Sequence, residues 1–106
     1  MDEIIFSVGM QVEFDDEKNE INYDKHGFSL KCAQDIVESI TLFGKDHYIM
    51  SDGYIDNGEQ RYMMLAEYSG VIVLIAFTWR NGTMRVISFR KAKKGKEVSI
   101  FYDHVG

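Results

Sequence analysis

The most informative absences in this chain of 106 residues concern cysteine, proline and long apolar runs. Cys32 is the only cysteine, so the chain cannot form an internal disulfide, and a reducing compartment suits it. Proline does not occur, which leaves no cis-proline turn to slow folding. No apolar run approaches the roughly 20 residues that cross a bilayer, and Asp2 and Glu3 stand where a signal peptide is basic. We therefore expect a cytoplasmic protein without a membrane segment or a secretion signal.

The sequence also lacks the motifs of several enzyme classes. It has no glycine-rich phosphate-binding loop and no nucleophile elbow, and its three histidines do not have the spacing of metal ligands. The acidic residues between positions 41 and 58 do not follow the pattern of a calcium-binding loop. We therefore expect neither a metal nor a cofactor, so any chemistry must depend on arginine, lysine, histidine and glutamate side chains.

Charge is distributed very unevenly along the chain. The net charge is −5, but from residue 80 onward seven basic residues stand against two acidic ones. Residues 1–79 are correspondingly acidic. A chain of this kind carries one cationic surface on an acidic body. This arrangement argues against general coating of DNA and favours a local phosphate-binding site.

The chain length predicts a single domain that spans residues 1–106. We interpret residues 1–9 as an added N-terminal segment that extends an edge strand. The alternation of polar and apolar residues over 10–14 predicts a short strand.

Two helices are expected after this strand. The first begins at the capping residue Asp15 or Asp16 and runs to about His26, where a glycine follows. The second covers residues 30–40 and is capped by Ser29, because its apolar residues recur with helical spacing. That spacing predicts one buried stripe on the second helix.

The strongest structural signal is the stretch of residues 71–90, in which Asn81 and Gly82 join two β-rich runs. An Asn-Gly pair favours a type I′ hairpin turn, because that turn needs positive φ at both central positions. Another β-rich run precedes the hairpin. We therefore expect a three-stranded antiparallel meander over residues 59–67, 71–80 and 83–90.

The turn also predicts which residues face each other in the hairpin. The expected pairs on one face are Arg80 with Thr83, Thr78 with Arg85, Ala76 with Ile87, and Leu74 with Phe89. In this register Arg80 and Arg85 share a face, whereas Arg90 lies on the opposite face. On the preceding strand, Glu59 and Arg61 share a face because they are two residues apart.

The remaining segments are less strongly patterned. Residues 41–58 are interpreted as a long excursion around the sheet edge, with short strand pieces at 41–43 and 47–50. A basic run follows the meander, and a helix is expected over 97–105 with Tyr102 on its apolar face.

Three groups of residues, in order along the chain, resemble a known family. They are Phe14, Asp16, Lys18, Asn22, Lys25, His26, Gly27, Ser29 and Ala33; then Glu59 and Arg61; then Arg85, Ile87, Ser88, Arg90, Lys91, Ala92, Glu97 and Tyr102. Together they resemble the opening, middle and closing signatures of BrnT-type toxins, over roughly residues 10–102. The resemblance implies an α+β, RelE-like fold and a ribonuclease toxin of a type II toxin–antitoxin pair. Its partner would be a small ribbon-helix-helix, BrnA-like antitoxin that masks the toxin and makes the contacts with DNA.

Metal-free RNA cleavage needs few groups. The 2′-hydroxyl attacks the adjacent phosphate, a base removes its proton, cations stabilise the developing charge, and an acid protonates the leaving oxygen. The planar guanidinium of arginine suits the phosphate oxygens. We expect Arg61, Arg80 and Arg90 to hold the phosphate, with Glu59 or His26 transferring protons. The expected RNA-binding residues are Lys25, Arg85, Lys91, Lys93 and Lys94.

Two alternatives stay open at this point. His26, at the end of its helix, either caps the C-terminus or takes part in catalysis. The whole chain is either an active endoribonuclease or a non-catalytic binding or regulatory subunit with the same fold, that is, an inactive toxin homologue.

Overall fold

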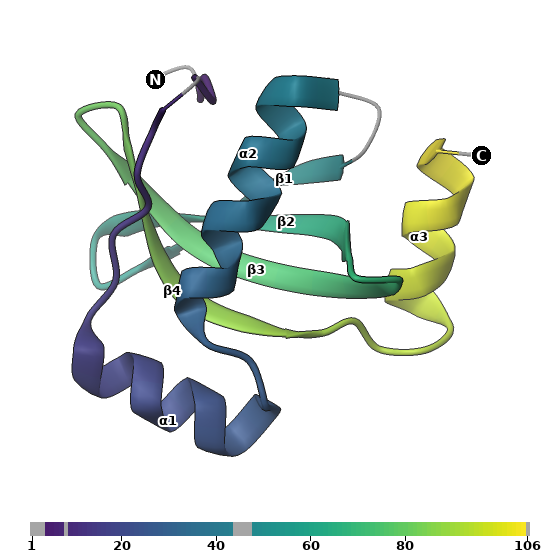
Figure 1. Ribbon diagram of the computed structural model, residues 1–106, viewed down its shortest axis with the longest axis horizontal. Helices are drawn as coiled ribbons and strands as arrows, with labels where there is room; N and C mark the ends of the chain where they lie inside the picture. The colour runs from purple at the N-terminus through teal and green to yellow at the C-terminus, as the bar shows by residue number, and fades with distance from the viewer. Residues whose placement is uncertain (1–3, 8, 44–47, 106) are drawn as a thin grey trace.

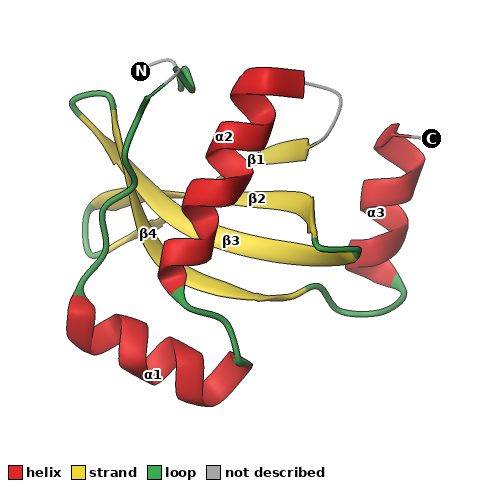
Figure 2. Ribbon diagram, in the orientation of Figure 1, coloured by secondary structure: helices red, strands yellow, loops and turns green. Residues whose placement is uncertain are grey.

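The computed structural model describes residues 4–7, 9–43 and 48–105 (Figure 1). In these ranges the chain is α+β, as the sequence predicts, with helices packed around one antiparallel sheet (Figure 2). The helices are α1 (Asp16–His26), α2 (Ala33–Phe43) and α3 (Lys96–Val105), with a 3₁₀ helix, η1 (Leu30–Cys32), before α2. The strands are β1 (Tyr48–Asp56), β2 (Glu59–Tyr68), β3 (Val71–Arg80) and β4 (Thr83–Lys91).

The strands lie in chain order in the sheet, β1-β2-β3-β4, and every neighbouring pair is antiparallel. Each connection is a two-residue turn in which both residues have positive φ, as a type I′ turn requires. The turn residues are Asn57 and Gly58, Ser69 and Gly70, and Asn81 and Gly82. The sheet is thus a four-stranded meander, one strand longer than the sequence predicts.

The additional strand, β1, corrects the interpretation of residues 41–58. Residues 41–43, expected as a strand piece, are the last turn of α2. Of the other expected piece, positions 48–50 belong to β1, and position 47 lies outside the described residues. β1 has a bulge between Ser51 and Tyr54 in its pairing with β2. This irregularity breaks the alternation by which a strand is recognised in sequence.

The register of the β3–β4 hairpin agrees with the prediction from the turn as far as Thr78, which pairs with Arg85. A β-bulge at Ile87 then adds one residue to β4. The pairs beyond it are Ala76 with Ser88, Ile75 with Phe89, and Leu74 with Arg90. The predicted pairs in this part are wrong by one position. As a consequence, Arg90 lies on the same face as Arg80 rather than on the opposite face.

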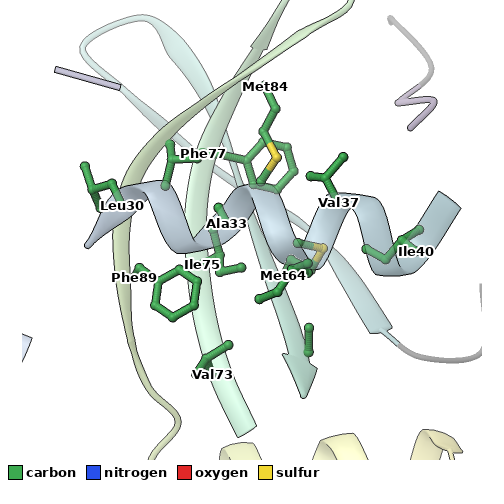
Figure 3. Close-up of a cluster of buried hydrophobic side chains, with 13 residues drawn as sticks. Leu30, Ala33, Val37, Ile40, Met64, Val73, Ile75, Phe77, Met84 and Phe89 are labelled. Atoms are coloured by element: carbon green, nitrogen blue, oxygen red, sulfur yellow. The ribbon is translucent and has the colours of Figure 1, made fainter. Parts of the chain in front are cut away.

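The main hydrophobic core lies between α2 and one face of the sheet (Figure 3). The stripe predicted for the second helix is confirmed, because all its members are buried: Leu30, Ala33, Ile36, Val37 and Ile40. They pack against alternate residues of the strands, among them Val73, Ile75, Phe77, Met84 and Phe89. Burial of each large apolar side chain contributes roughly 1.5–3 kcal/mol, so this face fixes the position of α2.

A second, smaller core lies on the other face of the sheet, under α3. Phe101 of this helix packs with Leu65, Ile72 and Leu74 of the central strands. Tyr102, expected on the apolar face, is instead 51% exposed. Because Phe101 meets Ile72 and Leu74, α3 covers the end of the sheet where β3 begins.

The first two helices begin where the sequence predicts. The side chain of Asp15 accepts a hydrogen bond from the N–H of Lys18, and Ser29 accepts one from Lys31, which opens η1. Gly27 follows α1 with φ of +79°, a left-handed conformation that glycine adopts without strain.

The outer edge of β4 is covered by α1 and by the segment that precedes it (Figure 1). Asn22 of α1 bonds to the backbone of Phe89 through both its amide oxygen and its amide nitrogen. Residues 10–14 do not form the predicted strand, because only Glu13 forms a bridge, parallel to β4 at Arg85. Phe6 packs edge-on against Tyr48 and Trp79, which ties the N-terminal segment to the core.

Within the described ranges, each helix is too short or too polar to span a lipid bilayer.

Candidate active site

Charged side chains collect on the sheet face that carries α3, beyond the area that this helix covers. Ile75 and Phe77 point toward α2, so Thr78 and Arg80, which alternate with them along β3, belong to the opposite face. Strand pairing adds residues of β1, β2 and β4 to this area. We call it the open face and define it by Tyr54, Asp56, Glu59, Arg61, Thr78, Arg80 and Arg85.

Every arginine in the described part of the chain is paired with a carboxylate. The pairs are Arg61 with Asp56 at 3.0 Å, Arg85 with Glu13 at 3.8 Å, Arg90 with Glu97 at 3.0 Å, and Arg80 with Glu59. Solvent-exposed pairs, such as those of Arg80 and Arg85, contribute only about 0–1 kcal/mol each. The pairs on the open face therefore neutralise the guanidinium groups without holding them strongly, so an incoming anion can compete with the carboxylates.

Two buried polar atoms on the open face have no hydrogen-bond partner among the described residues. They are the hydroxyl oxygen of Thr78 and the Nε of Arg61. An unsatisfied buried group costs about 1–3 kcal/mol. The two atoms belong to neighbouring strands of the same sheet face, so the unfilled hydrogen-bonding capacity is concentrated in one place.

A second cationic area lies where α1 contacts β4. Its centre is a hollow of about 200 Å³ lined by Lys18, Ile21, Asn22, Lys25, His26, Ile87 and Ser88. Ser88 is on the same side of the sheet as Thr78, because it pairs with Ala76. Burial lowers the pKa of His26 from its ordinary 6.5, and the positive charges of Lys25 and Arg90 lower it further. His26 is therefore mainly neutral at pH 7, the state in which its ring can accept a proton.

Arg90 forms a two-fold contact with Glu97. Both terminal nitrogens of its guanidinium donate to the carboxylate, each at 3.0 Å. The Arg90 guanidinium lowers the pKa of Glu97, partial burial opposes this effect, and the N–H of Lys93 supports it. This pair connects β4 with the first turn of α3, so Arg90 has a structural partner as well as a place near His26.

The strand register gives the distance of Arg90 from the open face. Arg85 pairs with Thr78 and Arg90 pairs with Leu74, which is four residues away along β3. At roughly 3.3 Å per residue, this is about 13 Å along the strand. Arg90 therefore shares a face with Arg61 and Arg80 but does not adjoin them.

Three of the four lysines predicted to bind RNA lie at the end of the sheet where β4 ends. Lys91, Lys93 and Lys94 are exposed at the end of β4 and in the turn before α3. Lys93 also lines a groove of about 610 Å³ between α3 and the sheet. These three lysines are nearer to Arg90 than to Arg61 along the strands.

Comparison with known proteins decides the family. A family model described as the ribonuclease toxin BrnT of type II toxin–antitoxin systems matches residues 14–96. The chain belongs to the BrnT family. No curated protein and no solved structure matches it.

The BrnT match confirms the resemblance found in the sequence and covers both cationic areas. It begins at the residue before the cap of α1 and ends at the start of α3. As a member of this family, the chain is a ribonuclease toxin whose system includes a protein antitoxin.

Some features of this BrnT chain were not found from the sequence. Asp56 and Thr78 were not among the expected site residues, because neither belongs to a motif. The sequence does contain one signal for Thr78, because it is a hydroxyl-bearing residue within the otherwise apolar run of β3. In the described part of the chain, no three histidine, cysteine or acidic side chains gather as a metal site would need.

Proposed function

We propose that this BrnT-family chain is an endoribonuclease of the mRNA interferase type with a RelE-like fold, which cleaves RNA without a metal. The 2′-hydroxyl of the substrate gives its proton to a base and attacks the adjacent phosphorus, and the bond to the 5′-oxygen of the next nucleotide breaks as an acid protonates that oxygen. The products are a 2′,3′-cyclic phosphate and a free 5′-hydroxyl. The observation that supports this proposal is the placement of Arg61, Arg80 and Arg85 on one sheet face, from three adjacent strands.

The arginines supply the electrostatic part of the reaction. One additional negative charge develops on the phosphate oxygens as the pentavalent state forms, and guanidinium groups fixed on a sheet stabilise it without rearranging. Arg61 and Arg80 bind the reacting phosphate in this scheme, and Arg85 binds the RNA beside it. Each must leave a carboxylate partner, which the weakness of exposed ion pairs allows.

Proton transfer is assigned by position. Glu59 is the favoured base, because it lies on the same face as Arg61, two residues away, and contacts Arg80. His26 is the second candidate, because its lowered pKa keeps its ring neutral. It lies with Lys25 in the hollow beside Arg90, where a neighbouring nucleotide of the RNA would bind. Lys91, Lys93 and Lys94 extend the cationic path along the end of β4.

The partner in this proposal is a ribbon-helix-helix antitoxin of the BrnA type. It masks the open face and carries the contacts with DNA, because the toxin itself is acidic overall. Expression of the chain alone should arrest growth, and co-expression of the antitoxin should restore it. A chain that leaves growth unaffected would contradict the toxic activity.

A second candidate function is a non-catalytic subunit of the same toxin–antitoxin complex. The observation that favours it is the pairing of every described arginine with a carboxylate. Purified protein incubated with RNA in EDTA separates the two functions. Fragments with 2′,3′-cyclic ends, absent when the nucleotide at the cleavage site is 2′-deoxy, support the enzyme. Intact RNA at micromolar protein supports the non-catalytic subunit.

A further inference from the structure

Thr78 stands out as a polar residue in the most buried strand of the protein. It is 2% exposed, and the strand around it is otherwise apolar up to Trp79. Its hydroxyl finds no partner in the described part of the chain. A valine has nearly the same shape and would avoid this loss, so the fold alone gives no reason for the hydroxyl.

The neighbours of Thr78 on both sides are arginines. Arg85 pairs with it on β4. On β2 the pairing continues to Tyr62 opposite Phe77, so the next position of that register sets Arg61 opposite Thr78. The ion pair between Glu59 and Arg80, two positions further, fits the same register. Thr78 therefore lies between two arginine residues on one face of the sheet.

The Nε of Arg61 is also buried and without a partner in the described ranges. Side-chain hydroxyl groups both donate and accept hydrogen bonds, whereas the Nε–H of arginine only donates. An oxygen with several lone pairs would satisfy both atoms together, and a phosphate oxygen is such an acceptor. Within the described ranges neither atom is bonded to a carboxylate, and that of Asp56 meets Arg61 at a terminal nitrogen instead.

We propose that the hydroxyl of Thr78 and the Nε of Arg61 bind one non-bridging oxygen of the reacting phosphodiester, while Arg85 binds the RNA beside it. The identity of the ligand as RNA rests on the proposed function. Thr78 is in this account a substrate-binding residue that no sequence motif marks. The bound oxygen accepts both hydrogen bonds, so the two unsatisfied atoms are paired only in the complex.

Access to this subsite is controlled by Asp56. Because Thr78 is buried in the free protein, the side chains that cover it must move before an anion reaches its hydroxyl. Arg61 is held at 3.0 Å by Asp56, the last residue of β1. The phosphate competes with this carboxylate for Arg61. Removal of the Asp56 charge should therefore strengthen phosphate binding.

The experiment compares Thr78→Val with Thr78→Ser, and uses Thr41→Val on α2 as the control for the same chemical change elsewhere. Binding is measured by NMR of the arginine Nε–H signals during titration with inorganic phosphate. A second titration uses an RNA oligonucleotide made uncleavable by 2′-deoxy substitution. Thr78→Val should weaken binding of both by on the order of tenfold, the loss of one hydrogen bond to a charged acceptor. Thr78→Ser and Thr41→Val should bind as the wild type does, and Asp56→Asn should bind more tightly.

The melting temperature distinguishes this role from a structural one. The Thr78→Val variant should melt at the wild-type temperature or above it while its affinity for phosphate falls, since valine leaves no unsatisfied hydroxyl. Unchanged binding in Thr78→Val, or an Arg61 Nε–H signal that does not move with phosphate, overturns the subsite even if the protein cleaves RNA. Conversely, phosphate binding that depends on Thr78 in a protein that cleaves no RNA supports the subsite and contradicts the proposed nuclease.

Discussion

The side-chain amide of Asn22 in α1 is hydrogen-bonded to both backbone groups of Phe89 in β4. The amide nitrogen donates to the carbonyl oxygen at 2.9 Å, and the amide oxygen accepts from the N–H at 3.1 Å. A strand edge normally needs a neighbouring strand to satisfy these groups. A single side chain takes that place here, and it holds the helix that carries Lys25 and His26 against the sheet.

Asn22→Ala should lower the free energy of unfolding by about 2–4 kcal/mol, because two buried backbone groups lose their partners. Glu20→Ala, at an exposed position of the same helix, should change it by less than about 0.5 kcal/mol. Urea unfolding followed by circular dichroism measures both. Equal stability of the two variants would contradict the role of Asn22 at the strand edge.

Gly53 gives a second test, at the bulge of β1. A Cβ atom there would lie 1.6 Å from the carbonyl oxygen of Arg61, and φ is +69°. Gly53→Ala should therefore destabilise the protein by at least about 3 kcal/mol and displace Arg61. Gly58→Ala is the matched control, since its φ is +78° but its Cβ meets nothing within 4 Å. The control should cost only about 1–2 kcal/mol. Thermal unfolding that ranks the two variants in the opposite order would refute the close approach.

Variants of Arg90 and Glu97 distinguish a role of Arg90 in RNA cleavage from its structural role. Glu97→Gln weakens the contact but keeps Arg90, and should cost about 1–2 kcal/mol of stability while RNA cleavage continues. Arg90→Ala should cost a similar amount and also slow cleavage, because it removes a positive charge beside the hollow where the proposal places a neighbouring nucleotide. Cleavage lost to the same degree in both variants would mean that Arg90 acts only by positioning α3.

His26 predicts a dependence of stability on pH. Its pKa in the folded protein lies below the ordinary 6.5, so the unfolded chain takes up a proton first as the pH falls. The folded state should lose stability as the pH falls through about 6.5. Glu97, whose pKa is also lowered, adds stability that is present above 4.5 and lost as the pH falls further.

The variant His26→Gln should lose less melting temperature than the wild type when the pH is lowered from 7 to 5. Below pH 4.5 the two curves should fall together, because Glu97 is common to both. Parallel curves over the whole range would show that His26 does not titrate in the predicted way.

Local signals in the sequence predicted much of the fold. Asp15 and Ser29 cap helices because their oxygens reach free N–H groups, and Asn81-Gly82 turns because both residues adopt positive φ. The same Asn-Gly signal is present at positions 57 and 58, and would have revealed β1. The strand before that turn was not recognised, because the bulge near Gly53 interrupts the alternation of polar and apolar residues in β1.

The candidate site was less predictable, since it depends on register. Arg61, Arg80 and Arg85 could be named because arginine suits phosphate, but one inserted residue, Ile87, decides the face on which Arg90 lies. No local pattern encodes that bulge. Nor does the sequence show that each guanidinium meets a carboxylate from another element, as Arg85 meets Glu13. Such contacts exist only after the chain has folded.

The most direct test of the account is RNA cleavage by Arg61→Gln in the presence of EDTA. Lys31→Gln, an exposed change on η1 that also removes one positive charge, is the control. We expect Arg61→Gln to cleave at least about 100-fold more slowly than the wild type, with a melting temperature within about 5 °C of it. The control should cleave at the wild-type rate and leave 2′,3′-cyclic ends. Wild-type cleavage by a folded Arg61→Gln protein would contradict the central claim that guanidinium groups on this sheet face bind the reacting phosphate.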